Sequence, residues 1–255
     1  MKQLTVYFLT NIGVCHGDIT DIQPHSHHFI QLCFGLQAGF RIMLNQQTYV
    51  SKACIITNDI EHQYTGLDEH QVIVLLDPES TIGQDLKAKL LKDLSILQLD
   101  SDIIKIFYLF EMNPLLPLDE VSDVVERLFL LLLGYENSKP SVDSRIASVQ
   151  SIIKHNPSEY DSKSLADSVF LSESRLIHLF KEQVGISMKQ YVLWQKLMKS
   201  ITYMMSGESL TVAAVNAGFA DSAHFSRTFK RMFGITPSEV FKNGDLVRVV
   251  VGDRY

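Results

Sequence analysis

Short apolar stretches separated by turn residues dominate the first third of the chain. Between residues 1 and 78, runs of β-branched and aromatic residues are divided by turn signals such as Gly39 and Asn45-Gln46, which is the pattern of β-strands. Many short strands at this spacing are typical of a sandwich or a small barrel. The predicted strands are Thr5–Leu9, Phe29–Leu36, Phe40–Leu44, Gln47–Val50, Ala53–Thr57 and Gln71–Leu76.

The pattern becomes helical between Ser80 and Tyr135, where apolar residues recur at helical spacing and predict three helices. The third is apolar on more of its surface than a helix with one exposed face needs. This helix packs either on the predicted strands alone or also on a second copy of the protein in a dimer. We expect a homodimer through residues 79–135, since two-fold dimers are the commonest oligomers. The helices are marked by Leu86, Leu90 and Leu94, by Ile103, Ile106, Phe107 and Phe110, and by Val121, Val124, Val125, Leu128, Leu131 and Leu132.

A repeat stands out in the second half of the chain. Residues 176–187 recur as residues 225–236, with an offset of 49 positions, and the copies share a Phe-Lys pair and a Gly-Ile pair. Upstream, the same offset places Phe170 on Phe219. A repeated short helical segment indicates one supersecondary element used twice, and each copy has the sequence of a helix-turn-helix.

Capping residues stand where a helix-turn-helix needs them. Ser172 suits the start of the second helix in the first copy, and Gly185 suits its left-handed end. Asp221 and Gly234 take these roles in the second copy. Between the copies, Met188–Met205 has no Gly or Pro and predicts one helix of 18 residues, roughly 27 Å long. Such a rod could present two recognition helices to successive major grooves, about 34 Å apart.

These residues carry a family resemblance. Residues 145–243 resemble the DNA-binding domain of the AraC/XylS family of bacterial transcription regulators, above all over the run GFADSAHFSRTFKRMFGITP at 218–237. The resemblance implies two helix-turn-helix units on a long linker helix that bind double-stranded promoter DNA, and RNA polymerase as a partner of an activator. The chain departs from the family pattern at His178, Lys196 and Ser200, where arginine, arginine and alanine are usual.

The resemblance also indicates which side chains face DNA. Arg227 is the best candidate for base readout, because a guanidinium pairs bidentately with guanine; a phosphate contact or an ion pair is the alternative. The lysines and Arg231 suit phosphate contacts or packing. The expected DNA-binding residues are Ser174, Arg175, Ile177, His178 and Lys181 in the first copy and Ser222, Ala223, Ser226, Arg227, Lys230 and Arg231 in the second.

Charge is divided unevenly along the chain. Residues 1–140 hold 9 Lys and Arg against 18 Asp and Glu, whereas residues 141–255 hold 14 against 11. The acidic half would be repelled by DNA, and the other half is only mildly basic. Non-specific affinity should therefore be modest and strongly salt-dependent. Tight binding should need two copies on one site or an effector.

Histidines cluster near the N-terminus. On an extended strand His25, His27 and Gln31 would share a face, and His62 follows later. This resembles the cupin motif, in which two histidines, a glutamate and a later histidine bind a metal inside a barrel. Three imidazoles could hold Zn²⁺, but Gln31 stands in the place of the carboxylate. We therefore expect an effector pocket lined by His25, His27, Gln31 and His62 with no metal and no cofactor.

Cellular location is indicated by three features. The first residues lack the pattern of a secretory signal. The longest apolar run, Leu128–Leu133, is far shorter than the roughly 20 residues that cross a membrane. Cys15, Cys33 and Cys54 have no CxxC spacing and are odd in number, which fits a reducing compartment. We expect a cytoplasmic protein with inert thiols and no membrane contact.

The expected fold is α+β, with an N-terminal cupin-like β-barrel plus helices and a C-terminal all-α domain of two helix-turn-helix units. The expected boundaries are a sensor barrel at 1–78, a helical segment at 79–135, a linker at 136–144, the DNA-binding domain at 145–243 and a strand-like tail at 244–255. The expected function is sequence-specific transcription regulation under a small effector, without enzymatic activity. The alternatives are a metal-dependent cupin enzyme joined to a DNA-binding domain and an architectural DNA binder without sequence preference; low basicity argues against the latter.

Overall fold

The computed structural model describes residues 4–9, 11–19, 21–67, 70–113, 115–134, 143–233, 236–241 and 247–251. The chain divides into two compact units. The first comprises residues 1–78, 82–137 and 228–255, and the second comprises residues 79–81 and 138–227.

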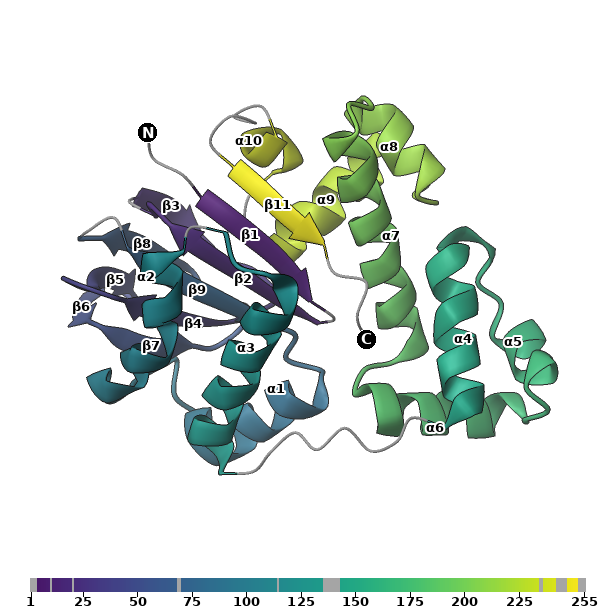
Figure 1. Cartoon of the computed structure of the whole chain (residues 1–255), viewed down its shortest axis with the longest axis horizontal. Coiled ribbons are helices and arrows are strands. Elements are labelled where there is room, and N and C mark those ends of the chain that lie inside the picture. The colour runs from purple at the N-terminus through teal and green to yellow at the C-terminus, as the bar shows by residue number, and fades with distance from the viewer. Residues whose placement is uncertain are drawn as a thin grey trace. The chain divides into compact units, whose positions relative to one another are not determined.

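A seven-stranded sheet forms the centre of the first unit (Figure 1). Its central strands, β4 and β9, are buried along their whole length and therefore read as nearly continuous apolar runs. At one edge the C-terminal strand β11 pairs in parallel with β1, from Leu4 opposite Val247 to Phe8 opposite Val251. The predicted strand in the tail is thus confirmed. The strand order is β10 (Ile96–Gln98), β7 (Ala53–Ile56), β4 (Ile30–Gly35), β9 (Gln71–Leu76), β2 (Ile12–Gly17), β1 (Leu4–Leu9) and β11 (Val247–Val251).

A second sheet has four strands, in the order β3 (Asp21–His25), β8 (His62–Gly66), β5 (Phe40–Leu44) and β6 (Gln47–Ser51). Strands β5 and β6 form a hairpin closed by Asn45 and Gln46, both with positive φ. Among the described residues the two sheets share no strand, and neither closes on itself. The mixed α/β class with an N-terminal sheet and C-terminal helices is confirmed, whereas the expected closed barrel is replaced by two open sheets.

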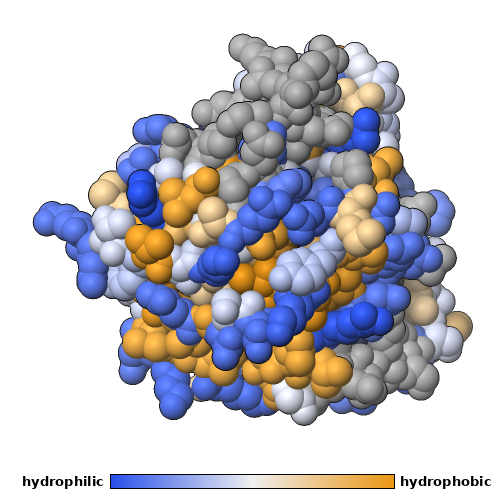
Figure 2. Space-filling view, turned by 60° about the vertical axis from the view of Figure 1, so that its left-hand side comes forward, coloured by the Kyte–Doolittle hydropathy of each residue, from blue (hydrophilic) through white to orange (hydrophobic). Residues whose placement is uncertain are grey.

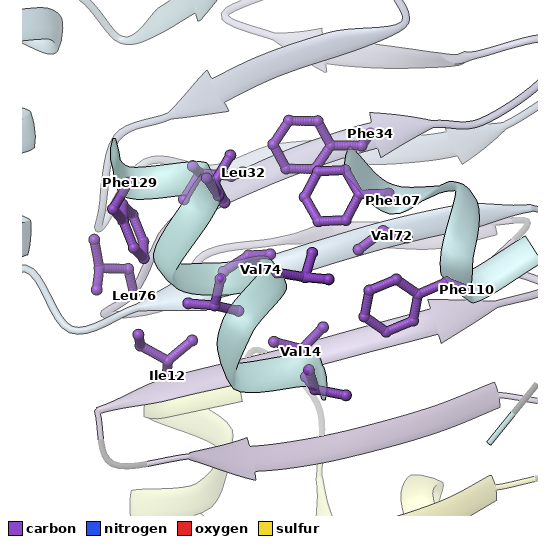
Figure 3. Packing of buried hydrophobic residues seen from close by; sticks show 14 of the residues in the cluster. Ile12, Val14, Leu32, Phe34, Val72, Val74, Leu76, Phe107, Phe110 and Phe129 are labelled. Carbon is purple, nitrogen blue, oxygen red and sulfur yellow. The ribbon is translucent and has the colours of Figure 1, made fainter. Parts of the chain in front are cut away.

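Helices cover one face of the seven-stranded sheet (Figure 3). The inward residues of β4 and β9, such as Leu32, Phe34 and Val74, pack against Phe107, Phe110 and Phe129. The Phe34 and Phe107 rings lie 4.4 Å apart between centroids. This core holds α3 (Leu118–Leu133) and the shorter helices before it on the sheet.

The first two helices of this layer are less regular than their apolar spacing predicts. Helix α1 (Thr81–Leu86) continues as a π-helical turn over Lys87–Leu91, and Lys92 ends it with a positive φ. Leu94, expected on the buried face, is 49% exposed. The second predicted helix is a 3₁₀ helix over Ser101–Phe107 followed by α2 (Tyr108–Met112).

Helix α3 is the third predicted helix. Val121, Val124, Val125, Leu128 and Phe129 are buried against the sheet core, whereas Leu131 is 60% exposed. The helix ends at Gly134, which has a left-handed φ of 76°. Among the described residues, part of the apolar surface of α3 is therefore left exposed to solvent.

The second unit is helical. Helix α4 (Ser144–His155) precedes α5 (Ser162–Ser168), α6 (Glu173–Val184), α7 (Met188–Met205) and α8 (Leu210–Asn216), while α9 (Ser222–Phe233) spans the boundary between the units. Its core joins α4, α5, α6 and the start of α7 through residues such as Ile146, Leu176 and Tyr191. Most of the predicted linker lies outside the described residues, as do Gly234 and Ile235 of the second repeat.

Helix α10 (Pro237–Phe241) begins at a proline, a residue whose fixed φ suits the first turn of a helix. Within the described part of the chain, no helix combines the length and the apolar character that a membrane crossing requires.

Candidate DNA interface and effector cavity

The first helix-turn-helix consists of α5 and α6. The Ser172 hydroxyl caps α6 by accepting a hydrogen bond from the Arg175 N–H at 3.3 Å, and Gly185 ends the helix with a φ of 86°. Leu176, Leu179 and Phe180 are buried. All five predicted DNA-binding residues of this copy are exposed: Ser174, Arg175, Ile177, His178 and Lys181.

The second helix-turn-helix consists of α8 and α9. Asp221 caps α9, since its carboxylate accepts a hydrogen bond from the His224 N–H at 2.6 Å. Phe225, Thr228, Phe229 and Met232 form the buried face. Of the predicted DNA-binding residues, Ala223, Arg227, Lys230 and Arg231 are exposed, and Ser222 and Ser226 are half-buried.

The two turns differ in a way that the repeat does not predict. The Phe219 side chain is 4% exposed, whereas the Phe170 side chain is 95% exposed and its φ is 56°. Leu171, half-buried against the core, takes the inward position instead. Phe170 and Phe219 therefore align in sequence but are not structurally equivalent, because the first side chain is exposed and the second is buried.

Helix α7 joins the two copies as the predicted uninterrupted helix of 18 residues. Ser187 and Gln190 form a capping box at its start. Ser200, one of the departures from the family pattern, is fully buried, and its hydroxyl donates to the Lys196 carbonyl at 3.0 Å. The hydroxyl is therefore satisfied within its own helix, which explains why serine is accommodated there.

A cavity of about 190 Å³ lies within the first unit. Its walls are mostly apolar, and its polar lining includes His25, His27 and Gln31. The sequence did not predict the apolar walls, because strands buried on both faces look like uniform core. The apolar lining consists of Leu4, Val6, Phe8, Ile19, Ile22, Ile73, Leu75, Phe229, Phe233, Val240 and Phe241, and Cys15 also contributes.

The histidines predicted for this pocket lie together. His25 ends β3 and pairs across the sheet with His62 at the start of β8. The ring centroids of His25 and His27 lie 4.6 Å and 5.2 Å from that of His62. Gln31, on β4, brings its Oε1 to 2.8 Å from His27 Nε2. All four predicted residues are therefore neighbours, although His62 does not line the cavity itself.

Burial sets the protonation of these rings. Desolvation lowers the pKa of His25 and His27, although hydrogen bonds to backbone carbonyls and, for His27, to Gln31 oppose it. Desolvation also lowers the pKa of His62, to about 4, and the other two imidazoles add to the effect. The three rings are therefore neutral at neutral pH.

Residues 165–243 match the family model of a helix-turn-helix domain. The arabinose operon regulatory protein of Salmonella typhimurium is 35% identical over 123 residues, which are 46% of this chain and 43% of that protein. The probable transcriptional regulator LumQ of Photobacterium leiognathi is 23% identical over 229 residues, 84% of this chain and 90% of that protein. The chain spans less than half the length of the first two curated relatives that it matches.

Among solved structures, ToxT from Vibrio cholerae with a bound unsaturated fatty acid has a similar fold. The TM-score is 0.51 at 14% identity, over 89% of this chain and 93% of that one. At this identity the likeness concerns the fold alone.

Proposed function

We propose that the protein is a sequence-specific DNA-binding transcription regulator of the AraC type, from the premise that residues 165–243 match the family model of a helix-turn-helix domain. One observation carries the proposal. Two capped recognition helices, α6 and α9, each bury a largely apolar face and leave small, polar and basic side chains exposed. Such faces suit base edges and phosphates in the major groove.

The role of each exposed residue follows from its chemistry. Arg227 is the candidate for base readout, and Arg175 and Lys181 supply positive charge on α6, with Lys230 and Arg231 on α9. The remaining candidates, Ser174, Ile177, His178, Ser222, Ala223 and Ser226, would lie against base edges or the backbone. RNA polymerase would be a further partner if the protein activates transcription.

We further propose that residues 1–78 sense a small effector, in the manner of a cupin-like sensor domain, and that residues 79–135 support a homodimer. The cavity combines apolar walls with a polar end at His25, His27 and Gln31, which suits a molecule with an apolar body and one polar group. Because ToxT was solved with an unsaturated fatty acid, such a fatty acid is a reasonable first probe.

An occupant of the cavity would touch α9 directly. Phe229 and Phe233 of that helix belong to the cavity wall, and Arg227 precedes Phe229 by two residues on the same helix. The Arg231 carbonyl accepts a hydrogen bond from the His28 N–H at 2.9 Å. These contacts support a coupling in which filling the cavity shifts α9 and changes the affinity for DNA.

Selection of bound sequences from a random DNA pool tests the main proposal. The full-length protein at moderate salt should enrich a motif with paired half-sites about one helical turn apart. A parallel selection with an unsaturated fatty acid present tests gating by an effector. Retention of random DNA without enrichment in either selection would contradict a sequence-specific regulator and favour an architectural binder.

A further inference from the structure

Two buried cysteines lie directly opposite each other in the seven-stranded sheet. Cys33 on β4 pairs with Cys54 on β7, and both side chains are 0% exposed. Their places in the chain hide this relationship, because residues 34–53 separate them and no CxxC spacing marks them. The sequence alone therefore favours inert thiols, whereas the register of the sheet brings two sulfur atoms together.

The backbone geometry at this pair allows a disulfide. The Gly35 N–H donates to the Lys52 carbonyl at 2.8 Å, and the hydrogen-bonded pairs of an antiparallel ladder recur at every second residue. Cys33 and Cys54 lie two residues further along each strand and are thus also a hydrogen-bonded pair, with Cα atoms about 5.5 Å apart. Disulfides span Cα separations of roughly 4.4–6.8 Å. The backbone therefore needs little movement for the bond to form.

Hydrogen bonds assign different roles to the two sulfurs. The thiols hydrogen-bond each other, and this bond together with burial raises the pKa of Cys54 well above its usual value. Cys54 therefore keeps its proton and is the donor to the Cys33 sulfur. The Gln31 amide nitrogen donates to the same sulfur at 3.1 Å. Donors that converge on one atom stabilise negative charge there, which suits Cys33 to attack an oxidant and Cys54 to close the disulfide.

The cavity offers a route to this pair. Gln31 lines the cavity and contacts Cys33, so a molecule of the size of water in the cavity is one side chain away from the sulfur. The third cysteine, Cys15, also lines the cavity, but β9 lies between it and Cys33, since Ile73 pairs with both. Two strand spacings of about 4.8 Å put Cys15 too far from Cys33 for a disulfide.

We propose that Cys33 and Cys54 form a dithiol site that hydrogen peroxide oxidises to a disulfide. Cys33 Sγ attacks one peroxide oxygen, the O–O bond breaks, and a sulfenic acid forms on Cys33 while the departing hydroxide takes the Cys33 proton and leaves as water. Cys54 Sγ then attacks the Cys33 sulfur. The S–O bond breaks as the S–S bond forms, and the second hydroxide takes the Cys54 proton and leaves as water. Two thiols and one peroxide thus give one disulfide and two waters, and the two sulfurs supply the two electrons.

Oxidation would draw the two strands together at this point. Opposed Cβ atoms lie roughly 4.5–5.5 Å apart in a sheet and about 3.8 Å apart in a disulfide. The bond would therefore pull β7 toward β4 and enclose the β5–β6 hairpin in a covalent loop. A disulfide formed against such resistance is readily reduced. The proposal does not depend on DNA binding, and its test counts thiols rather than measuring regulation.

The experiment uses the full-length protein, fully reduced and then freed of reductant. After treatment with a small excess of hydrogen peroxide, free thiols are counted in denaturant, and the remaining ones are alkylated for mass spectrometry. The count should fall from three per chain to one, with Cys33 linked to Cys54 and Cys15 alkylated. This linkage should exceed either linkage to Cys15 at least tenfold, and dithiothreitol should restore all three thiols. Digestion must cut at aspartate, because Asp18 and Asp21 separate Cys15 from Cys33 whereas no Lys or Arg does.

Matched variants separate the roles of the three thiols. Cys15→Ser should still form the disulfide, so that its thiol count falls from two to zero. Cys33→Ser should keep both of its thiols. Cys54→Ser should accumulate a sulfenic acid on Cys33 that dimedone traps, since no second thiol follows the attack. Circular dichroism shows whether each variant is folded.

The wild-type thiol count decides the proposal even if a variant does not fold. Native protein that keeps three thiols at a peroxide concentration that oxidises the denatured chain would overturn it, because the pair would then be inert packing. Oxidation of Cys15 before the other two cysteines would overturn it as well.

Discussion

Phe170 and Gly218 hold the same left-handed position at the end of the first helix of each helix-turn-helix, with φ of 56° and 92°. The N–H of the following residue, Leu171 or Phe219, donates a hydrogen bond of 3.0 Å to the carbonyl oxygen five residues earlier. These two positions are 48 residues apart, whereas the recognition helices start 49 apart. The second turn therefore contains one additional residue, and the two copies should respond differently to substitution at this point.

Phe170→Asn should stabilise the protein by about 0.5–1 kcal/mol. A non-glycine residue in the left-handed region costs roughly 1–2 kcal/mol, and asparagine tolerates it best. Little packing is lost, because the ring is 95% exposed. Thermal melting should show a rise of a few degrees. Phe170→Ala is the control, since it removes the ring and keeps the strain. If both variants lower the melting temperature equally, the ring is covered by a contact beyond this chain.

Gly218→Ala should destabilise the second unit by about 2 kcal/mol or more. Two effects combine: the left-handed φ disfavours a side chain, and a Cβ at this position would lie 2.7 Å from the Ser158 Cβ. Gly207→Ala is a matched control, because its φ is 94° and, among the described residues, no atom beyond its chain neighbours lies within 4 Å of the added Cβ. Chemical denaturation should show the larger loss for Gly218→Ala. Equal losses would mean that backbone strain alone is responsible and that the contact with Ser158 relaxes.

The regular elements of this chain were predictable where one periodicity dominates. The six predicted strands are all present, and so is the single long helix α7. Strands β2, β3, β8 and β10 were missed. Strand β3 contains Pro24, and β8 reads HQYTG, which has few of the apolar residues that mark a strand. They are strands because the sheet supplies hydrogen-bond partners, and a local pattern does not contain that information.

The candidate sites were likewise predictable from the sequence only where a local pattern marks them. The exposed faces of α6 and α9 follow from the helix caps and the helical spacing of apolar residues. The sequence therefore predicted that Arg175 and Arg227 are exposed on these helices, as they are. The histidine cluster was predicted from alternation along one extended strand and from a resemblance to the cupin motif, whereas His27 lies in the connection between β3 and β4 and not on a strand. The apolar cavity walls had no local signal, since they alternate with core residues along β1, β2 and β9.

Cys15 should react slowly with alkylating agents in the native protein. It lines the cavity, and burial raises the pKa of its thiol to about 12. Since the thiolate is the reactive form, the rate at pH 8 should be roughly 10³-fold below that of an ordinary cysteine. Mass spectrometry after timed iodoacetamide treatment would measure it, with the denatured protein as the reference. Rapid native alkylation at Cys15 would show that solvent reaches the thiol and that the cavity is open.

Leu131→Glu should weaken self-association if α3 forms the proposed dimer contact. Leu131 is 60% exposed on a helix whose opposite face is buried, and Met112 and Leu115 of the same unit are 80% and 50% exposed. Figure 2 shows one face of the molecule on which hydrophobic residues gather in patches between hydrophilic ones. Sedimentation should give a dimer for the wild type and a shift toward monomer for the variant. Ile152→Glu, at a 45% exposed position on α4, is the control. A monomeric wild type would remove the basis for the dimer.

Arg227→Ala should reduce affinity for the selected DNA site by about 1–3 kcal/mol and relax the preference at one base pair. The exposed guanidinium on α9 can pair bidentately with guanine only when it reaches a base edge. Competition titrations with cognate and random DNA at two salt concentrations separate the two kinds of contact. A base contact lowers cognate affinity far more than random affinity, whereas a phosphate contact lowers both equally and reduces the salt dependence. Arg41→Ala, which removes the same charge from an exposed position on β5, should leave the cognate preference unchanged. If Arg227→Ala lowers the affinity for cognate and random DNA equally, Arg227 contacts the DNA phosphates. Base readout would then fall to the small residues of α6 and α9.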